Sequence, residues 1–135
     1  TIAESQQFVV ARYNTTGTLD TAGFNSPTGY VTTPIQNDAQ GKSVILQSNG
    51  QIIAAGYSVN DFETQFALAR YSSSGTIDTT FGTNGIVLTT INDPACTVAS
   101  VAEIQKIVLQ SDEKIIAAGN ANLCYALARY FGASG

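Results

Sequence analysis

The sequence predicts an all-β domain made of repeated four-stranded antiparallel sheets. Two features lead to this prediction: a short motif that recurs at nearly constant spacing, and short β-branched segments separated by turn residues. The motif is FVVARY at 8–13, FALARY at 66–71 and YALARY at 125–130, so its copies begin 58 and 59 residues apart. A second pair of segments, 44–56 and 107–119, agrees as closely. The 135 residues therefore contain about two and a half repeats of about 58 residues.

Each repeat is expected to contain four short strands. Segment 44–47 is β-branched and apolar, and the Asn49-Gly50 pair that follows it is a strong hairpin signal. Segment 51–56 is the expected return strand, and 66–71 is the third. Segment 86–91, which follows a glycine turn, is the fourth. No segment combines a helical period with caps at both ends, so no helix is expected.

The second strand indicates how these sheets pack. Its apolar run, Ile52 to Ala55, has no polar residue at alternate positions, so both faces of the strand are expected to be buried. A β-sandwich would leave one polar face on each strand. Solenoid repeats rarely contain two hairpin signals each. A four-stranded meander of this length, repeated, is typical of the blades of a β-propeller.

These residues also resemble a known family. Residues 46–56 (LQSNGQIIAAG), 66–71 and 75–85 (GTIDTTFGTNG) together are similar to the bacterial delta-60 repeat, and the similarity extends over about 8–130. The resemblance implies a propeller-like fold in a secreted or cell-surface bacterial protein, in a family that mostly has no assigned activity. Two departures are visible: Asp112-Glu113 stands where the family has Asp-Gly, and segment 20–24 contains one extra residue.

The blades are expected to form one domain over 1–135. It comprises a partial blade at 1–35, a complete blade at 43–91 and a partial blade at 104–131. A closed propeller needs at least about four blades. The ring is therefore expected to be closed either by the remainder of a longer chain or by several copies in a homo-oligomer.

Composition excludes several classes of function. The net charge is −4, and only 12% of the residues are charged, so the basic surface of a nucleic-acid-binding protein is absent. The chain has no His, which removes imidazole catalysis and imidazole metal ligands. No apolar run approaches the ~20 residues of a membrane-spanning helix. The sequence predicts no cofactor and no metal site.

Ligand binding is expected at the loops that follow the second and fourth strands. These loops differ between repeats, with 57–65 much longer than 120–123, whereas the loops at the other end are uniform. Variable loops on a rigid scaffold are common recognition sites, although neutral variation would give the same pattern. The candidate ligand-binding residues are Tyr57, Asn60, Asp61, Phe62, Glu63, Asn120 and Asn122.

The sequence thus favours a non-enzymatic extracellular binding or scaffold module for a protein or glycan ligand. One alternative is a glycosidase-like hydrolase, in which two carboxylates would have to lie ~5–9.5 Å apart. The candidate carboxylates are Asp61, Glu63, Asp93 and Glu103. The other alternative is a self-assembling structural protein.

Two further sets of residues are predicted to stabilise the blades. Arg12, Arg70 and Arg129 recur in the motif, and Asp20 and Asp78 recur in the turn that follows. We expect them to form structural clamps, although a ring of arginines for an anionic ligand is the alternative. Cys96 and Cys124 are candidates for a disulfide, with two buried free thiols as the alternative. A disulfide would imply an oxidising compartment.

Overall fold

The computed structural model describes residues 5–92 and 101–132, and this part of the chain folds into three antiparallel sheets. Sheet 1 contains β1 (Phe8–Ala11) and β2 (Tyr30–Thr33). Sheet 2 contains β3 (Asp38–Leu46), β4 (Ile52–Val59), β5 (Thr64–Tyr71) and β6 (Ile86–Thr89). Sheet 3 contains β7 (Ala102–Leu109), β8 (Ile115–Ala121) and β9 (Cys124–Tyr130). The described residues form no helix, and so none that could cross a membrane.

Each sheet is a meander in which consecutive strands are hydrogen-bonded neighbours. The recurring motif lies in β1, β5 and β9, so these three strands hold the same place in their sheets. Sheet 2 is therefore a complete four-stranded unit. Among the described residues, sheet 1 corresponds to the last two strands of such a unit, and sheet 3 to the first three.

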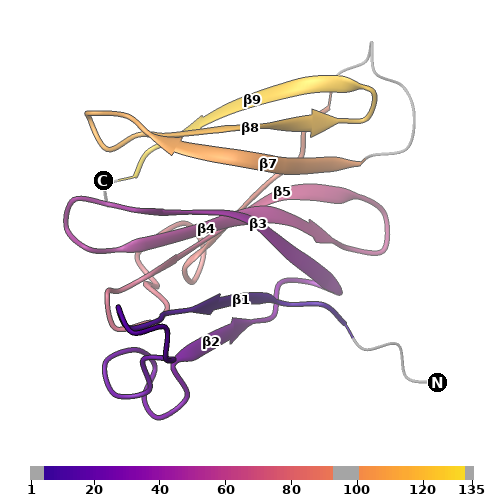
Figure 1. The fold of residues 1–135 in the computed structure, drawn as a ribbon. Helices are drawn as coiled ribbons and strands as arrows, with labels where there is room; N and C mark the ends of the chain where they lie inside the picture. Colours follow the sequence, from indigo (N-terminus) through magenta and orange to yellow (C-terminus); the bar gives the residue numbers. More distant parts are fainter. Residues whose placement is uncertain (1–4, 93–100, 133–135) are drawn as a thin grey trace.

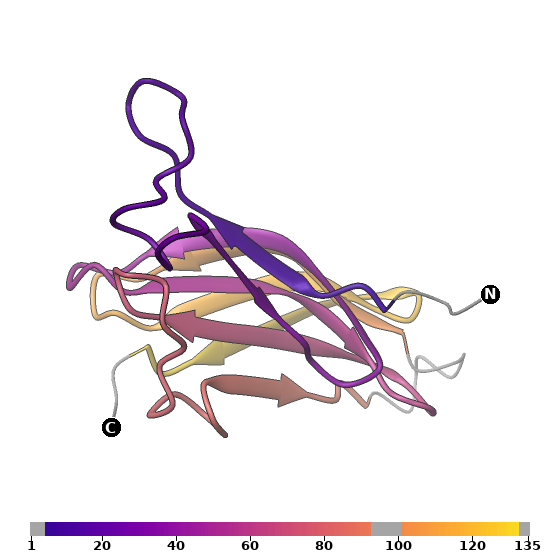
Figure 2. The ribbon, with the colours of Figure 1, turned by 90° about the horizontal axis from the view of Figure 1, so that it is seen from below.

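The three sheets are stacked face to face, with sheet 2 in the middle (Figure 1). Seen from below, β1 and β2 run obliquely across the strands of sheet 2 (Figure 2), as expected for stacked sheets that twist. One apolar core fills the space between sheets 1 and 2, and a second core fills the space between sheets 2 and 3.

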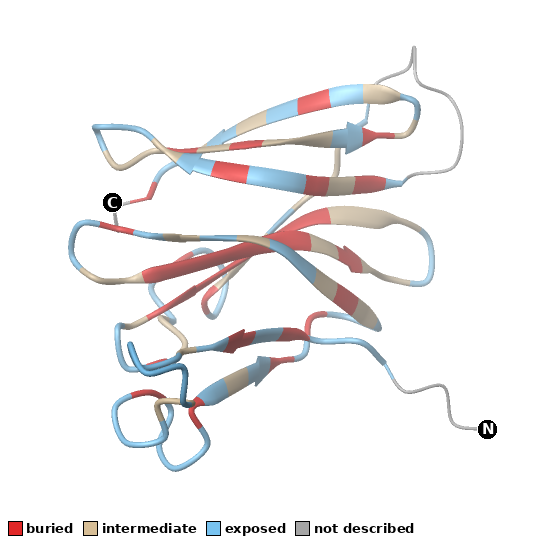
Figure 3. Ribbon diagram, in the orientation of Figure 1, coloured by how far each residue is buried: buried red, intermediate tan, exposed pale blue. Residues whose placement is uncertain are grey.

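The middle sheet is buried on both faces, as the apolar run in its second strand predicts. Ile53 of β4 belongs to the core shared with sheet 3, whereas its neighbour Ala54 belongs to the core shared with sheet 1. Residues 52–56 are all buried, which is visible as the continuous red of β4 in Figure 3. In β8 the same motif alternates between buried and half-buried residues, because among the described residues a second sheet covers only one face of sheet 3.

The first strand of sheet 2 begins earlier than the sequence predicts. We expected the complete blade to begin at residue 43, but β3 starts at Asp38 and is paired with β4 from there. A register shift between Gly41 and Ser43 lets the strand continue through its polar stretch, and β7 repeats the shift between Ile104 and Lys106. An irregularity of this kind is difficult to recognise in a polar segment.

Candidate functional site

The loops that follow the second and fourth strands lie at one end of the stacked sheets. We call this the variable end and define it by segments 34–37, 60–63 and 122–123. The first links sheets 1 and 2, and the other two are the β4–β5 and β8–β9 loops. The β4–β5 and β8–β9 loops lie on the same side in Figure 1, as the meander topology requires.

The β4–β5 loop is held in one conformation by two asparagines. The Asn60 Oδ1 atom accepts hydrogen bonds from the backbone N–H groups of Phe62 at 2.8 Å and Glu63 at 2.9 Å. The Asn37 amide donates to the Asp61 carboxylate at 2.6 Å, which ties the loop to the 34–37 segment. Phe62, at the tip of this fixed loop, is 92% exposed. An apolar ring is thus displayed to solvent on an ordered support.

The Glu63 carboxylate belongs to a chain of side-chain hydrogen bonds. Its Oε1 atom accepts from the Thr90 hydroxyl and from the Gln65 amide, both at 2.9 Å. The Gln36 amide donates to Gln65 Oε1 at 3.0 Å, and the Ser58 hydroxyl donates to Gln36 Oε1 at 2.7 Å. This network joins the 34–37 segment to β4, to β5 and to the end of β6. The role of Glu63 in it is structural.

The candidate hydrolase carboxylates have separate partners. Asp61 is bonded to Asn37 and Glu63 to Thr90, while Glu103 accepts from the Gln105 amide of its own strand at 3.2 Å. Asp93 lies outside the described residues. Within the described part of the chain, no hydrogen bond joins one of these carboxylates to another. In the described ranges, no group of three or more His, Cys, Asp or Glu side chains could hold a metal ion.

The remaining ligand-binding candidates lie on other parts of the fold. Tyr57 is half-buried in β4, with the Lys42 ammonium 5.6 Å from its ring centroid, and its pKa is raised by burial and by the charges of Glu103 and Asp38. Asn120 is exposed on β8, and the Asn122 side chain accepts from the backbone N–H of Val101 at 3.0 Å. The predicted set is therefore divided between sheets 2 and 3.

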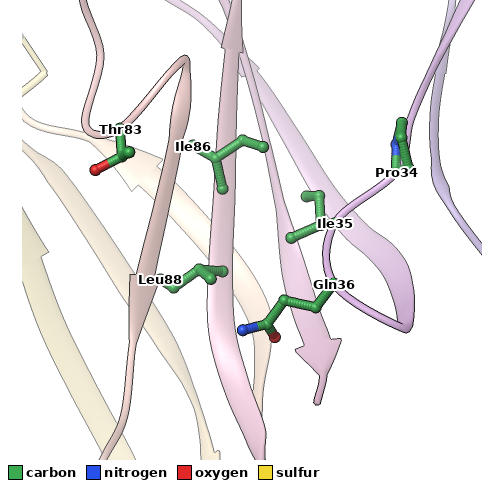
Figure 4. A pocket seen from close by; sticks show the side chains of 6 residues that line it. All are labelled: Pro34, Ile35, Gln36, Thr83, Ile86 and Leu88. Carbon is green, nitrogen blue, oxygen red and sulfur yellow. The ribbon is translucent and has the colours of Figure 1, made fainter.

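Sequence reasoning missed an apolar groove beside the 34–37 segment. It has a volume of about 420 Å³ and lies between this segment and β6 (Figure 4). Its lining residues are Pro34, Ile35, Gln36, Thr83, Ile86 and Leu88. They come from two segments that are distant in the chain, and apolar residues of this kind are expected in a core. The one available signal was Leu88, which replaces the Thr32 of the equivalent strand and is 37% exposed.

The predicted clamp residues meet in sheets 1 and 2. The Arg12 guanidinium lies 2.7 Å from the Asp20 carboxylate, and that of Arg70 lies 2.9 Å from Asp78. The backbone N–H of Gly23 and the Arg12 side chain lower the pKa of Asp20. The Thr80 hydroxyl, followed by its backbone N–H and by Arg70, lowers the pKa of Asp78.

A contact that the sequence did not predict extends each clamp to the next sheet. Arg12 donates to the backbone carbonyl of Ser73, just after β5 of sheet 2, at 2.7 Å, and Arg70 donates to that of Gly132, just after β9 of sheet 3. Ser73 and Gly132 are equivalent, because each lies two residues after the Tyr of the motif. Arg129, the third member, is exposed, and its side chain makes no ion pair or hydrogen bond with the residues of 5–92 and 101–132.

The cysteine pairing stays a prediction, because Cys96 lies outside the described residues. Cys124 is half-buried at the start of β9. Mass spectrometry after alkylation without a reductant would show whether the two thiols are bonded.

The described residues form repeated antiparallel sheets that are stacked face to face and do not close into a ring. This arrangement decides the fold class. The sheets are β-propeller blades. Residues 1–22 and 47–81 match the model of a domain of unknown function, DUF5122, described as a beta-propeller. These two matched segments contain the first two copies of the recurring motif, so the chain is similar to that family over part of its length. No curated protein and no solved structure matches the chain.

Proposed function

We propose that the chain is a non-enzymatic binding module. Its blades support the variable end, and this end binds a protein or glycan ligand. The observation that supports this proposal best is the position of Phe62. Its ring is 92% exposed on a loop that hydrogen bonds hold in place, and the 34–37 segment that anchors this loop also lines the apolar groove. The exposed ring and the groove thus share one rigid support.

This combination is suited to recognition. An aromatic side chain supplies a large apolar contact area and loses little conformational freedom when it is already fixed. The amide of Gln36 and the hydroxyl of Thr83 give the otherwise apolar groove two groups that can orient a ligand. Secretion to the cell exterior or surface of a bacterium is part of the same proposal, and it rests on the family resemblance.

The carboxylate-dependent alternative has no observation in its favour. Asp61 and Glu63 each accept hydrogen bonds from neighbouring amide or hydroxyl groups, and these donors are different for the two carboxylates. We therefore assign no catalytic residue.

The proposal can be tested with two probe sets, immobilised oligosaccharides and a displayed heptapeptide library. A probe that the wild-type chain selects should bind at least about tenfold more weakly to Phe62→Ala and to Leu88→Gln, a loss of ~1.4 kcal/mol. Leu46→Ala is the matched control, because Leu46 is 67% exposed but lies at the end of β3 that is opposite the variable end.

Equal binding of the selected probe to wild type, to Phe62→Ala and to Leu88→Gln would contradict this site. Chromatography of the oligosaccharides after incubation separates the alternatives, because release of shorter products would indicate a hydrolase.

A further inference from the structure

The outer face of sheet 3 is equivalent to a buried face of sheet 2. Phe66 and Leu68 of β5 are fully buried against sheet 3. Their equivalents in β9 are Tyr125, which is 97% exposed, and Leu127, which is 75% exposed. The same type of apolar surface is thus covered by a neighbouring sheet in one case and left open in the other.

The polar groups that join two sheets are also present on this open face. Arg70 and Gln47 of sheet 2 both donate to the carbonyl of Gly132, Gln47 at 3.0 Å. Their equivalents are Arg129 and Gln110, and both are exposed. Sheet 3 therefore presents, on an exposed face, the apolar residues and the donors that sheet 2 uses in its joint with sheet 3.

The open face also contains a groove of about 370 Å³ that is almost entirely apolar in its lining. The residues that line it are Gln105, Lys106, Ala118, Gly119, Asn120, Tyr125, Ala126 and Leu127. Apolar surface of this kind is typical of an interaction site.

The outer face of sheet 1, on the opposite side of the stack from sheet 3, presents the complementary half of the joint. Ala67 and Tyr71 of β5 form part of the face that packs on sheet 1, and both are fully buried. Their equivalents in sheet 1 are Val9, which is 59% exposed, and Tyr13, which is 64% exposed. The backbone carbonyl of Thr15, two residues after the motif, is equivalent to the acceptors that Arg12 and Arg70 use.

We propose that the outer face of sheet 3 binds the outer face of sheet 1 of a second copy of this chain. The joint would repeat the stacking of sheet 1 on sheet 2, with Leu127 packed near Val9 of the second copy and Arg129 donating to the carbonyl of Thr15. The two surfaces differ, so the contact is head to tail, and copies add in one direction until a ring closes. This surface is separate from the proposed ligand site.

The test uses two single variants, each of which blocks one of the two surfaces. Leu127→Glu places a charge on the sheet 3 face, and Val9→Glu places one on the sheet 1 face. Sedimentation over a concentration series should show oligomers for wild type and a loss of association of at least about tenfold for each variant. Leu123→Glu is the matched control, because it adds the same charge to an exposed leucine on the β8–β9 loop and should associate as wild type does.

Mixing the two blocked variants tests the head-to-tail geometry. The Leu127→Glu copy keeps its sheet 1 face and the Val9→Glu copy keeps its sheet 3 face, so the mixture should form a dimer of one copy of each and nothing larger. Arg129→Ala, which leaves the apolar residues unchanged, should weaken the association of otherwise wild-type chains. Circular dichroism spectra that match the wild type establish that the variants are folded.

Three results would overturn the proposal. They are a wild-type chain that stays monomeric at every concentration, oligomers that persist in Leu127→Glu or Val9→Glu, and a mixture of the two variants that forms no heterodimer.

Discussion

The Tyr71 phenol of β5 shares a 2.6 Å hydrogen bond with the Thr33 hydroxyl of β2 in the neighbouring sheet. The next pair of sheets repeats this bond, because the Tyr130 phenol donates to the Thr89 hydroxyl at 2.9 Å. Both bonds join the last residue of a motif to the fourth strand of the preceding sheet. Each apolar interface thus contains a directional contact between side chains, which acts together with the arginine bonds to Ser73 and Gly132 to align the sheets.

Replacing Tyr71 by Phe should destabilise the fold more than the same change at Tyr130. Tyr71 is fully buried and Thr33 is 8% exposed, so Tyr71→Phe leaves a buried hydroxyl without its partner and should cost about 1–2 kcal/mol. Tyr130 is only half-buried, so water can replace the lost phenol. Urea unfolding of the two variants measures the difference. Adding Thr33→Val to Tyr71→Phe should recover part of the loss, and no recovery would contradict this role of the hydroxyl.

Arg70 should contribute more to stability than Arg12, although both occupy the same motif position. The Arg70 side chain is 1% exposed and that of Arg12 is 39% exposed. Arg70→Ala removes the Asp78 ion pair, the bond to Gly132 and the contact with the Phe81 ring, whose centroid lies 4.6 Å from the guanidinium carbon. The expected loss is about 3 kcal/mol. Arg12→Ala should cost clearly less, because solvent screens an exposed pair.

Chemical denaturation of both arginine variants shows whether burial or motif position determines how much each arginine stabilises the fold. Equal losses would mean that the motif itself, rather than its environment, determines the contribution. Arg70→Lys should recover only part of the loss, because an ammonium group cannot bond to Asp78 and Gly132 in the geometry of the planar guanidinium.

The sequence predicted the repeated elements well and the contacts between repeats poorly. Apolar periodicity identified the buried β4, because strands that are covered on both faces contain no polar alternation. The pairs Arg12–Ser73 and Gln47–Gly132 join residues of different sheets through backbone carbonyls. Every residue has a backbone carbonyl, so an acceptor of this kind cannot be recognised from the pattern of side chains in the sequence.

The candidate site shows the same limit. Length variation directed attention to the loop that contains Phe62, but the groove beside it forms from apolar residues that the sequence cannot distinguish from core. The hydrogen bonds that occupy Asp61 and Glu63 depend on how segment 34–37 lies against the loop. That arrangement is a tertiary property.

The paired glycines of β3 and β4 should respond very differently to alanine. Gly56 and Gly41 are partners in the register of sheet 2. A Cβ atom at Gly56 would lie 1.9 Å from the backbone carbonyl oxygen of Gln40, whereas one at Gly41 would meet nothing within 4 Å. Gly56→Ala must therefore displace a strand and should cost at least about 2–3 kcal/mol, while Gly41→Ala should change stability by less than about 0.5 kcal/mol. Thermal and urea unfolding measure both, and equal effects would show that the bulge relaxes freely.

Acid should weaken the fold through the aspartates of the clamps. The pKa of Asp20 is lowered below its ordinary value of 3.8 by the Gly23 N–H and Arg12, and that of Asp78 is lowered chiefly by the Thr80 hydroxyl and then by its backbone N–H and Arg70. A lowered folded-state pKa means that the unfolded chain binds protons more readily. The stabilisation is therefore complete above pH 3.8 and is lost as the pH falls through the folded-state values.

The urea midpoint should thus be nearly constant above pH 5 and fall below about pH 4. Asp20→Asn combined with Asp78→Asn should lower the midpoint at neutral pH and flatten its fall in acid. Asp112, whose pKa Lys114 lowers in the same way, should account for part of the slope that remains. An acid slope in the double variant as steep as that of wild type would show that other groups control the loss of stability, and would contradict this role of the clamps.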